Sequence, residues 1–308
     1  MLTLFKFDIC DERKHFQLAV PIHARRYPPL LHAIFAVSAR HLSRLPQYRT
    51  PQGILYHGQL LPNITPNLAV EYMLKCIPAL RQFHESEDAE RREHIIATAV
   101  ILRQFEEIEE DEDETDYSAS IDESNPHSYT HERVNFLAVI NAAVRSSHSE
   151  DLFHRRDLFN AAYWMAVRQE VYYAFTRKQS PQMFLAPTLW QNASISNKMV
   201  MHASQVAKWL WDDKSEHEWR KLTSAFARNW YPDSGHLVRL KEQESNLCQQ
   251  LSGRYIPVFK RPADRSKGEV FPTIWYSSDI VVTGIQHLII SKMVLIAESP
   301  FVKYVCLY

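Results

Sequence analysis

The chain has 308 residues, and 45% of them are hydrophobic, which is enough for a large core in one or two domains. Its formal net charge of −1 excludes the strongly basic surface that a free-standing nucleic-acid-binding module carries. With only 6 glycines and no G-x-G-x-x-G, G-x-x-x-x-G-K-[ST] or G-x-S-x-G motif, nucleotide-binding loops and a hydrolase nucleophile elbow are not expected. This composition predicts an all-α protein, a large irregular multi-helix bundle in a single domain over residues 1–308.

The cysteines and the N-terminal residues indicate the cellular compartment of the protein. The four cysteines stand singly, without a C-x-x-C pair, so they predict neither a cysteine zinc site nor a disulfide framework: Cys10, Cys76, Cys248 and Cys306. Acidic residues interrupt residues 1–12 before a long apolar segment forms, unlike a signal peptide. We therefore expect a soluble, intracellular protein.

Apolar residues recur every three or four positions in the first third of the chain, which is typical of helices. The first predicted helix covers residues 30–45 and ends at Pro46. Four prolines then predict a loop over residues 46–66. The next helix covers residues 67–83, and Pro78 inside it predicts a kink or a break.

The middle of the chain alternates between apolar helices and polar connections. Residues 95–107 predict a strongly apolar helix, and the acidic, serine-rich stretch at 107–130 predicts a flexible surface loop. Further helices are predicted over residues 131–144 and 161–175. A break at residues 180–187 follows.

Four helical segments are predicted in the last third of the chain. Residues 196–211 are helical by period, and an amphipathic stripe follows at Trp219, Leu222, Phe226 and Trp230. A further helix over 237–251 rests on a weaker pattern. The final segment, 279–297, is apolar enough to raise the question of a membrane span, but polar residues inside it favour a buried core helix: Gln286, His287 and Lys292.

One predicted helix poses a physical problem. Residues 158–176 are apolar almost throughout, yet Arg168, Gln169 and Glu170 stand side by side in the middle. Three consecutive residues cover more than half of a helix circumference, so at least one of them must point into the interior. An unpaired buried charge costs several kcal/mol, so the fold must supply partners, and we expect the 95–107 helix to supply one.

Similar polar insertions occur in two other apolar helices. Together they form one candidate set: Arg40, His41, Arg103, Gln104, Glu106, Arg168, Gln169 and Glu170. The favoured interpretation is a buried, mutually satisfied network that fixes the register of the helices. The alternative is a polar pocket between helices that takes an effector molecule.

The acidic run suggests an alternative function. In an all-helical enzyme of the isoprenoid-synthase type, Asp111, Asp113 and Asp116 would hold a Mg²⁺-diphosphate through carboxylate oxygens. Such an enzyme needs a second carboxylate-rich motif across a cavity, and no second motif stands on a predicted helix. We therefore favour a solvated acidic linker.

No metal, cofactor or catalytic site is predicted from local motifs. The 15 histidines include two that begin an H-E-x-x-H pattern, at His131 and His217. The fifth positions hold Asn135 and Lys221, so the second metal ligand is missing in both. We predict no catalytic activity.

Several blocks resemble the fungal-specific transcription factor domain, the helical regulatory region of fungal zinc-cluster transcription factors. They are CDERKHFQLAVP (10–21), LLHAIFAVSARHLSR (30–44), ATAVILRQFEEIEE (97–110), LFNAAYWMAVRQEVYYAF (158–175), the stripe at 219–230, and VFPTIWYSSDIVVTGIQHLIISKMVL (270–295). They follow the order of that family and span most of the chain. The family's six-cysteine binuclear zinc cluster does not occur in this sequence.

The resemblance implies a function. It implies a nuclear protein in transcription regulation that contacts the transcription machinery or another regulator subunit and responds to a small-molecule effector. It also implies self-association as a homodimer, only indirect contact with DNA, and no membrane. No cofactor is implied for this chain, because zinc would belong to the cluster that the sequence lacks.

Overall fold

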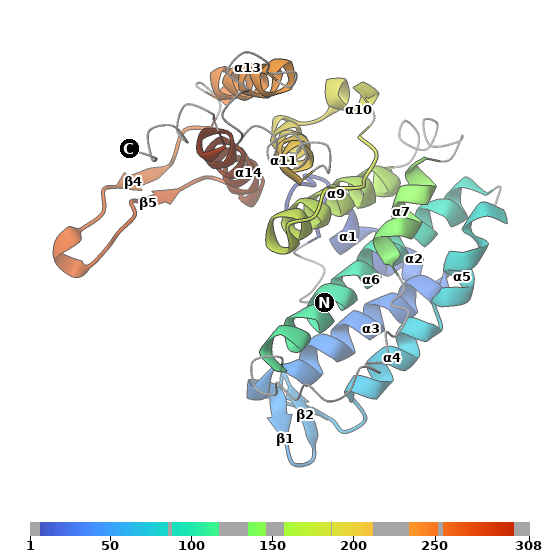
Figure 1. Ribbon diagram of the computed structural model, residues 1–308. Helices are drawn as coiled ribbons and strands as arrows, with labels where there is room; N and C mark the ends of the chain where they lie inside the picture. Colours follow the sequence, from blue (N-terminus) through green and yellow to red (C-terminus); the bar gives the residue numbers. More distant parts are fainter. Residues whose placement is uncertain are drawn as a thin grey trace, which may run out of the picture. The chain divides into compact units, whose positions relative to one another are not determined.

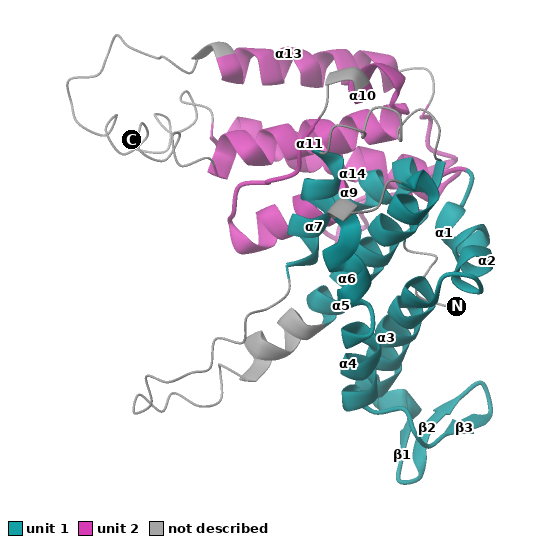
Figure 2. Ribbon diagram, turned by 90° about the vertical axis from the view of Figure 1, so that its right-hand side faces the viewer, with its two compact units in different colours: residues 1–8, 13–166 teal, residues 9–12, 167–308 magenta. Residues whose placement is uncertain are grey.

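The computed structural model describes residues 7–85, 88–116, 135–145, 157–185, 187–211, 234–251 and 255–298. Helices dominate these residues and the strands are short, so the predicted all-α, multi-helix fold is confirmed (Figure 1). The chain gathers into two compact units (Figure 2). Unit 1 comprises Met1–Asp8 and Arg13–Ala166, and unit 2 comprises Ile9–Glu12 and Val167–Tyr308. A compact unit is not by itself an independently folding domain, so the single domain over 1–308 stays a prediction.

Unit 1 begins with two short helices and one long one. Helices α1 (His15–Leu18) and α2 (Val20–Ala24) lead into α3 (Pro28–Arg44). The two prolines at the start of α3 fall in its first turn, where proline needs no hydrogen-bond partner for its nitrogen. The predicted 30–45 helix is thereby confirmed, and α3 packs against α4 and α6 (Figure 1).

The predicted loop at 46–66 contains a small sheet, so that prediction was wrong in part. A 3-10 turn, η2 (Pro46–Tyr48), precedes the antiparallel strands β1 (Arg49–Thr50), β2 (Gly53–Tyr56) and β3 (Gln59–Leu61). Strands this short leave no alternating pattern in the sequence. Gly53 has a φ of 134°, and a Cβ there would lie 2.6 Å from the Cα of Pro62, so this turn requires glycine.

Pro78 divides the next predicted helix, as expected. Helix α4 (Pro66–Leu74) is capped by Thr65, whose side chain accepts the amide of Leu68 at 3.1 Å. Helix α5 (Ile77–Arg81) carries Pro78 in its first turn, and the 3-10 turn η3 (Gln82–Glu85) follows it. The break therefore lies just before the proline, which lacks the N–H that would continue α4.

The longest helix of unit 1 is α6 (Ala89–Asp116), which contains the predicted 95–107 helix. Residues 107–116 of the predicted acidic loop are helical, so this part of the loop prediction was wrong. Glutamate is a strong helix former, and its propensity outweighs the charge density that suggested a loop. Residues 117–130 lie outside the described residues. Helix α7 (Phe136–Val144) follows, with Asn135 as its N-cap.

Helix α9 (Asp157–Arg177) passes from unit 1 into unit 2 at residues 166–167. Unit 2 continues with α10 (Pro187–Asn192), α11 (Ile195–Trp211), α13 (Ser234–Leu251) and α14 (Asp279–Ala297). These helices confirm the predicted segments at 161–175, 196–211, 237–251 and 279–297. The aromatic stripe at 219–230 lies outside the described residues.

Helix α14 packs closely against α11 (Figure 2). Its buried face consists of residues spaced three or four apart: Val281, Gly284, Leu288, Ser291 and Leu295. By length and composition α14 could also cross a membrane, and only 28% of its apolar stretch is buried, so the prediction of a buried core helix is confirmed for this face alone. The opposite face exposes apolar residues, including Met293 at 64%.

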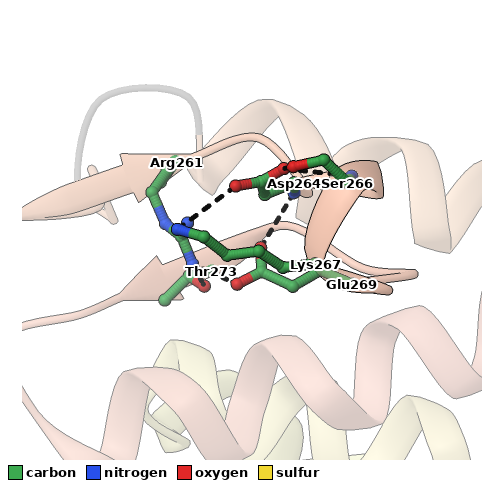
Figure 3. A network of polar contacts seen from close by, with 6 residues as sticks. All are labelled: Arg261, Asp264, Ser266, Lys267, Glu269 and Thr273. Atoms are coloured by element: carbon green, nitrogen blue, oxygen red, sulfur yellow. Dashed lines mark hydrogen bonds and ion pairs between the residues drawn. The ribbon is translucent and has the colours of Figure 1, made fainter.

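A two-stranded hairpin connects α13 to α14. Strands β4 (Phe259–Arg261) and β5 (Thr273–Trp275) pair antiparallel around a 3-10 turn, η4 (Arg265–Lys267). A polar network at the surface shapes this turn (Figure 3). The carboxylate of Glu269 accepts hydrogen bonds from the backbone amide of Asp264 at 2.8 Å and from the guanidinium of Arg261 at 2.7 Å. These two bonds lower the pKa of Glu269. The network is exposed and local, so we assign it a structural role.

The contact between α11 and α14 generates a stability prediction. A Cβ at Gly284 would lie 3.0 Å from the Cα of Ser196 and 2.9 Å from the Cε of Met199. Gly284→Val should therefore lower the free energy of unfolding by about 1–3 kcal/mol through overpacking. Gln286→Val, at an exposed position of the same helix, is the matched control and should change it by no more than about 0.5 kcal/mol. Urea denaturation of both variants measures the difference, and equal effects would contradict close packing at Gly284.

Candidate functional site

In unit 1 the predicted polar residues join three helices. Arg103 is buried in α6, and its Nη1 lies 2.7 Å from Oε2 of Glu106 one turn further on. The other oxygen of Glu106 accepts the backbone amide of Phe136 at 3.2 Å, which ties the start of α7 to α6. The charges are thus paired where they are buried, which reduces the cost of burying them.

Helix α3 contributes through an aromatic contact. The guanidinium carbon of Arg40 lies 5.2 Å from the ring centroid of Phe105 on α6, within the range of a cation–π interaction. His41 and Gln104 are both partly buried. The network interpretation for unit 1 stays a prediction.

In unit 2, Glu170 anchors the segment that follows α9. Its side chain is buried, and its carboxylate accepts the backbone amides of Gln182 and Met183. The Met183 amide lies 2.9 Å and 2.8 Å from the two carboxylate oxygens. Hydrogen bonds to an ionised acceptor are about twice as strong as neutral ones. Lys178, at a φ of 55°, ends the helix and turns the chain back toward Glu170.

Arg168 lies at a junction of three segments within unit 2. The thiol of Cys10 lies near it and near Thr283 of α14, since both side chains oppose the rise that burial causes in the pKa of this thiol. His287, one turn after Thr283, places its Nδ1 2.7 Å from the Thr283 carbonyl oxygen. The contribution of the 95–107 helix to the partners of Arg168 and Glu170 stays a prediction.

The protonation states at this junction follow from burial. Burial raises the pKa of the Cys10 thiol, and the charge and hydrogen bond of Arg168 oppose that rise. Burial lowers the pKa of His287, the hydrogen bond to Thr283 opposes the change, and Arg168 lowers the pKa further. A neutral thiol is a poor nucleophile, so this cluster is suited to hold segments together rather than to attack a substrate.

A cavity of about 510 Å³ also lies in unit 2, against α11 and α13. Its lining is mostly polar and carries both charges: Trp190, Gln205, His236, Arg239, Leu240, Glu242, Gln243, Asn246, Leu247 and Gln250. None of the eight predicted candidates lines it. This cavity could not be predicted from the sequence because polar residues on an amphipathic helix are usually on its solvated face.

The acidic run is the candidate metal site of the alternative function. Asp111, Asp113 and Asp116 belong to the C-terminal part of α6, and their side chains lie outside the described residues. The isoprenoid-synthase alternative therefore stays a prediction.

The sequence analysis did not predict one cluster of side chains that could bind a metal ion. In unit 1, one ligand atom each from His23, Glu90 and His94 lie within 4.8 Å of one another. Glu90 and His94 stand one helical turn apart on α6, which is a weak signal in the sequence. His23 stands on α2, 71 residues before His94, so no local motif could include it.

Comparison with family models, curated protein sequences and solved structures gives no match for this chain. The resemblance to the regulatory domain of fungal zinc-cluster factors therefore rests on the sequence blocks quoted above.

Two buried histidines of unit 2 predict a pH dependence of stability. Burial lowers the pKa of His202 and of His287, and a hydrogen bond to Gln243 opposes the change at His202. Between the lowered folded pKa and the unfolded value of about 6.5, the unfolded chain binds more protons than the folded chain. The stabilisation is therefore complete above about pH 7 and is lost as the pH falls below the unfolded pKa.

We expect the free energy of unfolding to decrease between pH 7.5 and pH 5.5. His202→Gln, which removes one titrating group and keeps a hydrogen-bonding side chain, should flatten this decrease. Gln286→Val, at an exposed position of α14, removes no titratable group and is the control, so it should leave the decrease unchanged. Chemical denaturation at several pH values measures the slope, and equal slopes for the wild type and His202→Gln would contradict the assignment.

Proposed function

We propose that this chain acts in transcription regulation, as a helical regulatory domain resembling that of the fungal zinc-cluster factors. The proposal rests on the resemblance, and one structural observation supports it. Three of the blocks that carry the resemblance contribute to the junction at Arg168. Cys10 comes from block 10–21, Arg168 from block 158–175, and Thr283 and His287 from block 270–295. Residues from the blocks that carry the resemblance therefore contribute to the packing of unit 2.

A regulatory domain needs a place where a ligand can bias its packing. The polar cavity against α11 and α13 is our candidate for the effector site, because its lining offers both charges and several amides. Helix α11 packs against α13 on one side and against α14 on another. Helix α14 carries Thr283 and His287 of the junction. An effector that binds α13 and α11 would therefore act on the junction through packed helices.

This proposal places the chain in the nucleus, in contact with the transcription machinery, a second regulator subunit or another copy of itself. Contact with DNA is proposed to be indirect, in keeping with the net charge of −1. The proposed role involves no catalytic step and no membrane.

A reporter assay in a fungal host tests the proposal. The full chain is fused to a heterologous DNA-binding module, and transcription from its target promoter is compared with that of the module alone. We expect the fusion to change transcription by at least about threefold, in either direction. Arg239→Gln with Glu242→Gln, both exposed cavity residues, should alter this change without lowering the amount of fusion protein. Arg265→Gln, at an exposed position outside the cavity, is the control and should leave it unaltered. Unchanged transcription across growth conditions, with the fusion present in the nucleus, would contradict the proposal.

A further inference from the structure

Three side chains with metal-binding atoms converge at the start of α6. His94 is buried at 6% exposure, His23 on α2 is half-buried, and Glu90 is exposed. The Nε2 of His94 and the Nδ1 of His23 lie 2.9 Å apart. One ligand atom of each of the three side chains lies within 4.8 Å of the others. Two imidazoles and one carboxylate are a ligand set found in open zinc sites.

The surrounding contacts hold the first turns of α6 in place. Asp88 accepts the amide of Glu90 at 3.0 Å, which caps the helix. Arg91 donates to Gln82 at 3.1 Å, and Arg92 lies over the ring of Phe83. These contacts tie the turn that carries Glu90 to the preceding segment.

The two imidazole rings are also held against each other. The ring of His94 lies 4.7 Å from that of His23 and 5.2 Å from that of Tyr27, measured between centroids. His23 and Tyr27 stand four residues apart, so one short stretch of chain packs both rings against His94. To reach a shared ion, the exposed Glu90 would swing inward and the two rings would move slightly apart.

The two ring nitrogens of His23 and His94 lie within hydrogen-bond distance of each other. Two imidazole lone pairs at 2.9 Å repel, so either a proton or a cation must lie between them. In the hydrogen-bonded state, one of the two nitrogens carries the proton. In a metal-bound state, both nitrogens offer lone pairs, and the ring that carried the shared proton bears it on its other nitrogen instead.

We propose that His23, Glu90 and His94 form a binding site for a divalent transition metal ion of the borderline class, with zinc as the representative ion. A zinc ion at about 2.05 Å from both ring nitrogens would subtend an angle of about 90° at their present spacing. Opening the pair to about 3.3 Å would give the tetrahedral angle. The carboxylate of Glu90 completes three protein ligands, and the exposed side of the site leaves a position for water or for a further ligand.

The site would act within unit 1 as a link between α2 and α6, because His23 comes from one helix and the other two ligands from the other. It goes beyond the proposed regulatory function and does not depend on it. A chain with no role in transcription would bind the metal equally well, so the two proposals fail separately.

Metal titration of the purified full chain tests this site. We expect one equivalent of Zn²⁺ to bind by calorimetry, and one equivalent of Co²⁺ to give the visible absorption of a nitrogen- and oxygen-ligated ion. Glu90→Gln, at an exposed position, should weaken Zn²⁺ binding at least about tenfold, and His23→Gln should abolish the one-equivalent site. His236→Gln removes an exposed histidine elsewhere and should leave binding unchanged.

Thermal unfolding provides an independent readout of the same site. Zn²⁺ should raise the unfolding temperature of the wild type and of His236→Gln, because an ion that binds only the folded state stabilises it. It should not raise the temperature of His23→Gln. Both side-chain changes lie at positions that are not fully buried, and circular dichroism of the metal-free variants verifies that they fold. The absence of one-equivalent binding in the wild type would overturn the proposal. Binding unchanged in Glu90→Gln or in His23→Gln would overturn it equally.

Discussion

Unit 2 depends on how α9 accommodates buried charge. The helix is apolar almost all round, yet Arg168 and Glu170 are 8% and 2% exposed. Water solvates neither group well there, so protein groups must replace it. Glu170 accepts hydrogen bonds from backbone amides of the segment that follows α9, and the charge of Arg168 acts on the thiol of Cys10 from the start of the chain. Glu170 thus fixes the backbone of the segment that follows α9.

This constraint shapes the surroundings of α9. The amide pair at Glu170 holds the chain after Lys178 close to the helix it has just left. At Arg168, the thiol of Cys10 lies near both α9 and Thr283 of α14, since Arg168 and Thr283 both act on its pKa. Helix α14 in turn meets α11 so closely that Gly284 has no room for a side chain. The polar junction and the apolar contact therefore support the same helix from two sides.

The helices could be predicted from the sequence because their apolar periodicity is local. The segments that became α3, α11 and α14 show it clearly. The strands β1–β3 could not, since two to four residues leave no alternation, and the end of α6 was missed because dense charge masked the helix propensity of glutamate. The apolar neighbours predicted that at least one residue of the α9 triplet is buried, whereas all three are buried in the structure.

Long-range pairing explains the rest of what the sequence did not show. Cys10 is a lone cysteine by sequence, and only the fold brings it to Arg168. His23 and His94 belong to separate helices, and neither matches a metal-binding motif. The polar cavity arises where α11 and α13 meet, at positions that the sequence pattern assigns to a solvated face. Sites of this kind are formed by residues that are far apart in the sequence or on different helices.

The free energy of unfolding of Glu170→Met tests most directly whether buried charge on α9 organises unit 2. Methionine has a similar volume but accepts no strong hydrogen bond, so the buried amide of Met183 would lose its partner. We predict a loss of about 2–5 kcal/mol, whereas Glu242→Met on the exposed face of α13 should change the value by no more than about 0.5 kcal/mol. A near-neutral effect of Glu170→Met would contradict this role of the α9 charges.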